Sequence, residues 1–67
     1  MTFLTAVKNH MGKKDISTYR AAKETKWSQS YIWLVLNGQR NGSIAFFKDM
    51  SKYTGVSLDL LKEESNN

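Results

Sequence analysis

The 67-residue sequence contains no cysteine and no proline, and its single histidine is His10. Without cysteine neither a disulfide nor a thiolate metal centre can form, and one histidine is too few for a Cys/His metal cage. No apolar run approaches the roughly 20 residues that span a bilayer, and no signal-peptide stretch follows Met1. We therefore expect a soluble, cytoplasmic protein with no cofactor, no metal and no membrane partner.

The sequence also lacks the residue groups that enzymes use. It shows no paired carboxylates, no Cys-His pair, no phosphate-binding loop and no cluster of metal ligands, so we expect it not to be an enzyme. A chain of this length forms one domain, here residues 1–67, with room for one apolar core and one surface site. We accordingly expect no pocket for a small-molecule ligand.

Positive charge is concentrated in the first two-thirds of the chain. Residues 1–48 contain eight basic and two acidic side chains, a net charge of +6, whereas residues 49–67 have a net charge of −2. The whole chain carries +4 at pH 7. A basic region of this kind is compatible with a polyanionic partner, although mildly basic small proteins are common and charge alone does not identify nucleic acid.

The apolar periodicity predicts an all-α fold of five short helices. Three- and four-residue steps from Phe3 to Met11 predict a helix over about 2–11, with Gly12 as a left-handed stop. Ser17, or Asp15 just before it, predicts the start of a second helix over about 18–25, with Ile16, Ala21 and Ala22 on its buried side. No segment shows the strict alternation of a strand.

Three further helices follow in the same way. Ser28 predicts the start of a helix over about 29–36, which Asn37-Gly38 ends. Ser43 predicts a fourth helix that Gly55 closes, and Ser57 a short fifth helix carrying Leu58, Leu60 and Leu61. Residues 63–67 are expected to form a frayed tail.

The segment over residues 17–38 resembles the helix-turn-helix of the Cro/CI (Xre-type) phage repressor family. The similarity rests on Ala22, Trp27, the cap Ser28, the apolar pair Ile32 and Val35, and the stop Asn37-Gly38. In the family pattern the alanine at the Ala22 position is tightly packed against the following helix, so the resemblance implies the same here. It continues into residues 55–61, so it covers about residues 3–61. It implies a five-helix, lambda-repressor-like DNA-binding domain, closest in organisation to the single-domain Cro proteins.

The sequence departs from the family pattern at three places. Lys26 stands where the turn usually has glycine, which requires a left-handed or otherwise adjusted backbone there. Trp33 and Leu36 occupy positions that are usually polar. The loop over residues 39–43 is about one residue longer than in close relatives.

The resemblance implies double-stranded DNA as partner, with the start of the 29–36 helix in the major groove. Gln29, Ser30 and Leu34 match positions that contact base edges, and Trp33 lies on the same outward side. A glutamine amide matches adenine N6 and N7, and an apolar group matches a thymine methyl. The expected phosphate contacts are Thr18, Ser28, Tyr31, Arg40, Asn41, Lys13, Lys14 and Lys26.

Single domains of this kind usually bind near-palindromic operators as dimers. By resemblance, the dimer interface comes from the region of the fourth and fifth helices, with Val56, Leu58 and Leu60 as its apolar candidates. The alternative is that these three residues belong to the apolar core. Other assignments have alternatives too: Trp33 fits a core or subunit contact as well as DNA, Tyr31 fits packing, and Lys13 and Lys14 fit a solvated loop.

The function predicted from the sequence is a Cro-like transcriptional repressor. The alternative is an antitoxin-type protein-interaction module that regulates its own expression through the same DNA-binding domain. RNA binding is compatible with the charge, but no sheet with stacking aromatics is predicted.

Overall fold

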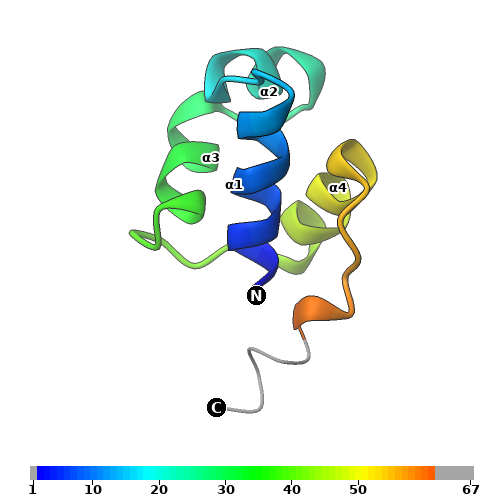
Figure 1. Cartoon of the computed structure of the whole chain (residues 1–67). Coiled ribbons are helices and arrows are strands. Elements are labelled where there is room, and N and C mark those ends of the chain that lie inside the picture. Colours follow the sequence, from blue (N-terminus) through cyan, green and yellow to red (C-terminus); the bar gives the residue numbers. More distant parts are fainter. Residues whose placement is uncertain (1, 62–67) are drawn as a thin grey trace.

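The computed structural model describes residues 2–61, which contain four α-helices joined by short loops and no strand (Figure 1). The predicted all-α class is confirmed. The helices are α1 (Phe3–Lys13), α2 (Thr18–Glu24), α3 (Gln29–Leu36) and α4 (Ile44–Thr54). None of them combines the length and the apolar composition of a membrane span.

Each helix is preceded by a serine or threonine whose backbone is extended and whose hydroxyl caps the helix. The Oγ atoms of Ser17, Ser28 and Ser43 accept hydrogen bonds from the backbone N–H three residues later, at 3.1, 3.2 and 3.2 Å. Thr2 caps α1 in the same way. These contacts satisfy one of the four N–H groups that lack partners at a helix start, which confirms the three predicted serine caps.

The helix ends follow the prediction except at α1. Gly38 and Gly55 have φ values of 74° and 83° and close α3 and α4. The predicted stop at Gly12 is wrong, because α1 runs through it to Lys13. Asp15, with φ 55°, is the left-handed residue instead, and the Ile16 N–H bonds back to the Met11 carbonyl at 2.8 Å. Aspartate tolerates this conformation better than most side chains do.

The predicted fifth helix is not among those of residues 2–61, which number four rather than five. The Ser57 Oγ accepts from the Asp59 N–H at 3.1 Å, and Leu61 N–H bonds to the Leu58 carbonyl at 3.0 Å. These contacts close a turn, and a helical conformation begins at Leu60 and Leu61, where the described residues end. The predicted frayed tail, residues 63–67, lies outside the described part.

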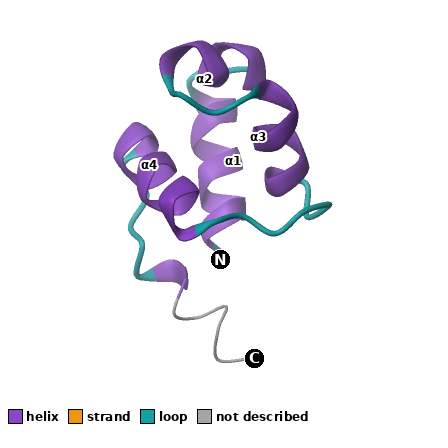
Figure 2. Ribbon diagram, turned by 180° about the vertical axis from the view of Figure 1, so that it is seen from behind, coloured by secondary structure: helices purple, strands orange, loops and turns teal. Residues whose placement is uncertain are grey.

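A single apolar core lies between the helices, with α1 packed against both α3 and α4, and α2 packed on α3 (Figure 2). Ala21, fully buried, is the small residue of α2 that faces this core, whereas Ala22 is only half-buried. The predicted buried side is confirmed for Ala21, whereas Ala22, the alanine that the resemblance marks as tightly packed, packs against the core but is only partly buried. The buried apolar residues are Phe3, Val7, Met11, Ala21, Ile32, Val35, Leu36, Phe46 and Met50.

Candidate functional site

The turn between α2 and α3 is built on a threonine side chain. Thr25 has an extended backbone, and its Oγ1 donates to the Ala21 carbonyl at 2.8 Å and accepts from the Trp27 N–H at 3.3 Å. Lys26 therefore avoids the left-handed conformation that glycine favours; among non-glycine residues 2–61 only Asp15 has positive φ. The adjustment expected at Lys26 is made by its neighbour Thr25.

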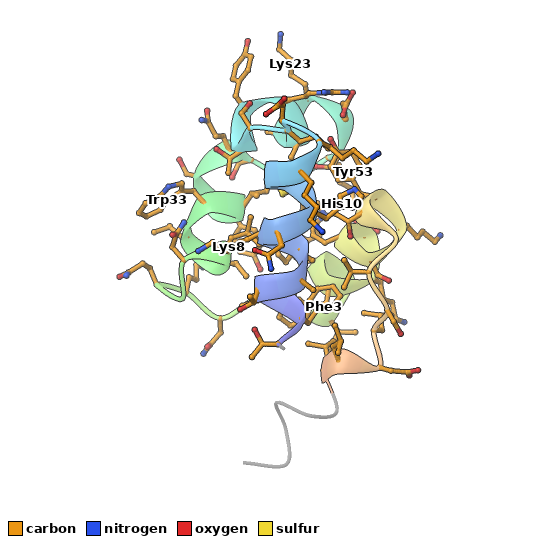
Figure 3. The ribbon with its side chains drawn as sticks, in the orientation of Figure 1. Phe3, Lys8, His10, Lys23, Trp33 and Tyr53 are labelled. Carbon is orange, nitrogen blue, oxygen red and sulfur yellow. The ribbon has the colours of Figure 1, made fainter. Side chains whose placement is uncertain are left out.

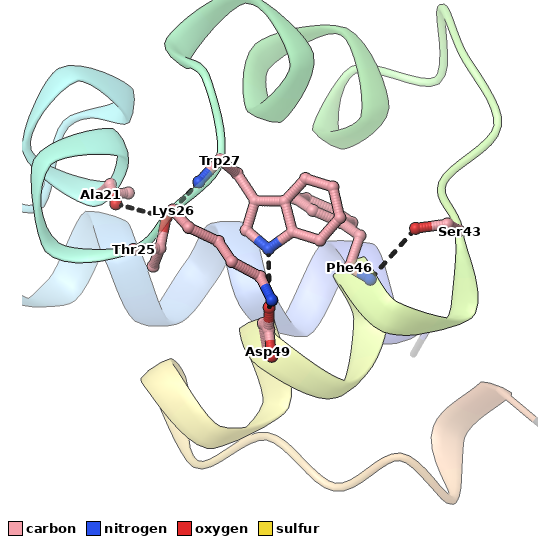
Figure 4. Close-up of polar contacts among 7 residues, drawn as sticks. All are labelled: Ala21, Thr25, Lys26, Trp27, Ser43, Phe46 and Asp49. Carbon is pink, nitrogen blue, oxygen red and sulfur yellow. Dashed lines mark hydrogen bonds and ion pairs between the residues drawn. The ribbon is translucent and has the colours of Figure 1, made fainter.

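Trp27 ties this turn to α4 (Figure 4). Its indole Nε1–H donates to Asp49 Oδ2 at 2.8 Å, and its ring stacks on Tyr31 with centroids 5.2 Å apart. Phe46 meets both rings edge-on, at 5.3 and 5.1 Å. The side of the first turn of α3 that carries Tyr31 is thus packed against α4, and the opposite side of this turn faces outward.

That outward side gathers all four residues predicted to contact bases. Gln29, Ser30, Trp33 and Leu34 line one open hollow of about 460 Å³ on α3. Gln29 and Ser30 are exposed, Leu34 is half-buried, and the Trp33 residue keeps 50% of its surface accessible. Figure 3 shows Trp33 projecting away from the body of the domain. Polar amide, hydroxyl and apolar ring surface therefore face the same direction.

Thr18 links this hollow to the start of α2. The Gln29 Nε2 donates a long hydrogen bond to Thr18 Oγ1, at 3.4 Å. With one amide proton so engaged, the other N–H and the carbonyl oxygen of the exposed Gln29 side chain have no hydrogen-bond partner within residues 2–61. One donor beside one acceptor is the complement of the N6–H and N7 edge of adenine.

Comparisons with models of known protein families, with curated proteins and with solved structures found no match. What the site binds is therefore inferred from its own geometry and charge. Within residues 2–61 there is no group of three histidine, cysteine or acidic side chains that would hold a metal ion.

The exposed residues predicted to contact phosphates, four basic residues and Asn41, differ in their surroundings. Lys13 ends α1 and Lys14 is its C-cap, and both are exposed. Arg40 and Asn41 are exposed in the loop after α3, where the Arg40 guanidinium carbon lies 5.1 Å from the Tyr31 ring centroid. Lys26 is highly exposed, but its Nζ lies 3.7 Å from Asp49 Oδ2, on the side of α4.

Two other predicted phosphate contacts, Ser28 and Tyr31, have roles within the protein. The Ser28 Oγ caps α3, and the half-buried Tyr31 is part of the aromatic cluster and accepts a hydrogen bond from the Ser43 N–H at 3.0 Å. Among the predicted phosphate contacts, Thr18 is the one whose side chain is hydrogen-bonded to a residue that lines the α3 hollow.

The residues predicted for a dimer interface pack on the core. Val56, Leu58 and Leu60 are all half-buried and contact the buried cluster. All three follow α4 in the sequence.

Two groups of residues were missed by the sequence analysis. Asp49 links Trp27 and Lys26, and Tyr53 Oη donates to Glu24 Oε1, which also lies 3.4 Å from Arg20 Nε. The hydrogen bond from Tyr53 lowers the pKa of Glu24, and burial together with Glu24 raises the pKa of Tyr53 to about 12. No local pattern marks the Trp27–Asp49 and Glu24–Tyr53 pairs, because their members lie 22 and 29 residues apart.

Proposed function

We propose that the protein is a sequence-specific double-stranded DNA-binding regulator, a Cro-like repressor with a lambda-repressor-like helix-turn-helix. In this proposal α2 and α3 form the helix-turn-helix, and the first turn of α3 enters the major groove. The observation that carries the proposal is that Gln29, Ser30, Trp33 and Leu34 line one outward hollow whose only hydrogen-bonded neighbour in α2 is Thr18.

The chemistry of this hollow supports base recognition. Gln29 offers one donor and one acceptor, which together match adenine, and Ser30 offers a shorter hydroxyl. Trp33 and Leu34 add apolar surface that suits a thymine methyl or sugar. No acidic side chain lines the hollow, so nothing in it repels a polyanion.

Phosphate contacts would come from the residues around this face. Thr18 stands at the start of α2, and Arg40 and Asn41 follow α3. With α3 in the major groove, we expect these three residues to contact phosphates that border the groove. Lys13 and Lys14 add exposed positive charge. Such contacts supply much of the affinity and make it fall steeply with salt.

A homodimer on DNA follows from the small size of one domain. Two copies would place their α3 helices about 34 Å apart on a near-palindromic operator. Val56, Leu58 and Leu60 stay the candidates for the interface, since their half-buried state leaves apolar surface for a second copy.

The test is selection of bound duplexes from a random pool, using the wild type and Gln29→Ala. The wild type is expected to select a dyad-related motif, and Gln29→Ala to lose preference at one position in each half-site. The expected loss there is about 1–3 kcal/mol of discrimination, as for a bidentate contact.

Asn41→Ala is the matched control, because it removes an amide from an exposed loop outside the hollow. It is expected to weaken binding without changing the selected motif. An unchanged motif with Gln29→Ala would remove Gln29 from base recognition. Failure of the wild type to prefer any duplex, together with tight binding to a protein, would favour the antitoxin-type alternative.

A further inference from the structure

The loop that joins α3 to α4 (Figure 1) is held by a hydrogen bond at each end. At its start the Gln39 N–H donates to the Leu34 carbonyl at 2.8 Å. At its end the Ser43 N–H donates to Tyr31 Oη at 3.0 Å. Three residues of the chain lie between Gln39 and Ser43, so the backbone has a short path between two fixed points.

The loop also lies close against the core at Gly42. A Cβ atom at this position would come within 2.9 Å of the Phe47 ring and 3.0 Å of Val35 Cγ1. A side chain here would have to displace Phe47, whereas glycine lets the backbone approach it. The backbone on which Arg40 stands is therefore set by the fold.

Arg40 rests on an aromatic ring and has no ionic partner in the protein. Its guanidinium carbon lies over the Tyr31 ring, 5.1 Å from the ring centroid, which is within the range of a cation–π contact. Across the described part of the chain it forms no ion pair and no side-chain hydrogen bond, which leaves its five N–H donors unused. Arg20 differs, because its Nε lies 3.4 Å from a carboxylate oxygen of Glu24.

The Tyr31 ring is fixed in turn by its neighbours. It stacks on Trp27 with centroids 5.2 Å apart, and it meets Phe46 edge-on at 5.1 Å. The residue is half-buried. A ring held in this way offers a guanidinium a surface of fixed position.

We infer that Tyr31 is a positioning residue that presents the Arg40 guanidinium to the DNA backbone. Its hydroxyl holds the end of the loop, and its ring holds the arginine side chain. A long side chain that is ordered before binding loses less conformational entropy when it binds. Tyr31 then acts on DNA through Arg40 and not by a contact of its own. This inference rests on the proposed DNA-binding function, in which Arg40 is a phosphate contact.

The first test uses the free protein without DNA. Protons that lie over an aromatic ring are shielded, so NMR spectra of the wild type are expected to show Arg40 side-chain protons shifted upfield. Tyr31→Phe retains the ring and should retain the shift, whereas Tyr31→Leu should lose it. Unshifted Arg40 protons in the wild type would overturn the inference.

The second test is a double-mutant cycle of Tyr31→Leu and Arg40→Gln, read as affinity for the selected operator. Tyr31→Leu alone is expected to weaken binding by roughly two- to tenfold for each half-site, which corresponds to ordering one long side chain. In the Arg40→Gln background the same change should have little effect, because no guanidinium is left to position. Tyr31→Phe should keep most of the affinity. Thermal unfolding gives the temperature at which every variant is folded.

The matched control is Asp49→Ala, which removes the acceptor of the Trp27 indole in the same aromatic cluster but no contact of Arg40. It also lowers stability, so it is expected to have the same effect on affinity with Arg40 and with Arg40→Gln. Coupling to Arg40 is thus expected for Tyr31→Leu alone.

The results separate this inference from the proposed function. Equal losses for Tyr31→Leu with Arg40 and with Arg40→Gln would indicate a direct contact of Tyr31 or a general loss of structure. That outcome would overturn the positioning role and leave the proposed function in place, provided that the wild type selects an operator. A wild type without preference for any duplex would overturn both.

Discussion

The outward face of α3 and the flank where α2 meets α4 are both polar, but their side chains are engaged differently. On the flank, Asp49 accepts from the Trp27 indole and pairs with Lys26, and Tyr53 donates to Glu24. On the α3 face, the Gln29 side chain makes one hydrogen bond within residues 2–61, to Thr18, and Trp33 is half exposed.

The comparison separates polar groups that are satisfied within the protein from polar groups that can still bind a partner. A side chain whose hydrogen-bonding capacity is met inside the protein contributes to holding helices together, and it has little left for a partner. A side chain with unused donors and acceptors in a hollow can meet a ligand. Changes on the flank are therefore expected to alter stability, and changes on the α3 face to alter binding.

The largest effect on the flank is expected for Asp49→Ala. This change leaves the partly buried indole N–H of Trp27 without its acceptor, which costs about 1–3 kcal/mol in the free energy of unfolding. Urea denaturation measures the loss. Operator preference is expected to be unchanged at temperatures where the variant is folded.

Two further variants sharpen this result. Asp49→Asn retains a carbonyl acceptor for the indole and is expected to recover much of the stability. Lys26→Gln removes only an exposed ion pair, so its effect should stay below about 1 kcal/mol. Equal losses for Lys26→Gln and Asp49→Ala would contradict the role assigned to the indole hydrogen bond.

On the α3 face, Trp33 is expected to recognise a thymine methyl. Replacing the relevant thymine by uracil removes that methyl alone and should weaken wild-type binding by about 0.8 kcal/mol, roughly fourfold in Kd. Trp33→Ala should bind the two operators equally. Competition titration measures both pairs.

Tyr19→Ala is the control, because Tyr19 is another exposed aromatic residue, on α2 and outside the hollow. It should retain the thymine preference of the wild type. If Trp33→Ala instead changed the association state of the free protein and kept that preference, Trp33 would belong to a subunit interface.

The smallest effect is expected for Tyr53→Phe, whose influence on the free energy of unfolding is greatest near neutral pH and decreases in acid and in alkali. The Tyr53 hydrogen bond lowers the pKa of Glu24, so its stabilisation is present above pH 4.5 and is lost as the pH falls through the lowered pKa. Burial, then Glu24, raises the pKa of Tyr53 from 10.0 to about 12. That stabilisation is present below pH 10 and is lost as the pH rises toward 12.

Urea denaturation over both pH ranges checks this expectation. The difference in unfolding free energy between the wild type and Tyr53→Phe should shrink in each range, whereas Tyr19→Phe should show no such pattern. A constant difference at all pH values would indicate that only packing was lost.

Features set by neighbouring residues were predictable from the sequence. Ser17, Ser28 and Ser43 each cap a helix through a contact three residues away, so the sequence alone indicates where α2, α3 and α4 begin. The grouping of Gln29, Ser30, Trp33 and Leu34 follows from helical periodicity in the same way.

Features set by tertiary contacts were not predictable. Gly12 has the composition of a helix stop, but α1 continues to Lys13 and the left-handed residue is Asp15. Whether Ala21 or Ala22 faces the core depends on the rotation of α2 against α3, which one residue pattern does not determine. The Trp27–Asp49 hydrogen bond likewise depends on how residues distant in the sequence meet.

The contrast between the two tryptophans gives the domain its own pair of optical probes. Trp27 emits from an aromatic cluster with its indole held by a carboxylate, so its fluorescence follows the integrity of the fold. Trp33 emits from the open surface of α3, where a collisional quencher reaches it and a bound duplex would shield it. Single replacements by phenylalanine would thus let folding and occupancy be followed separately, without an attached dye.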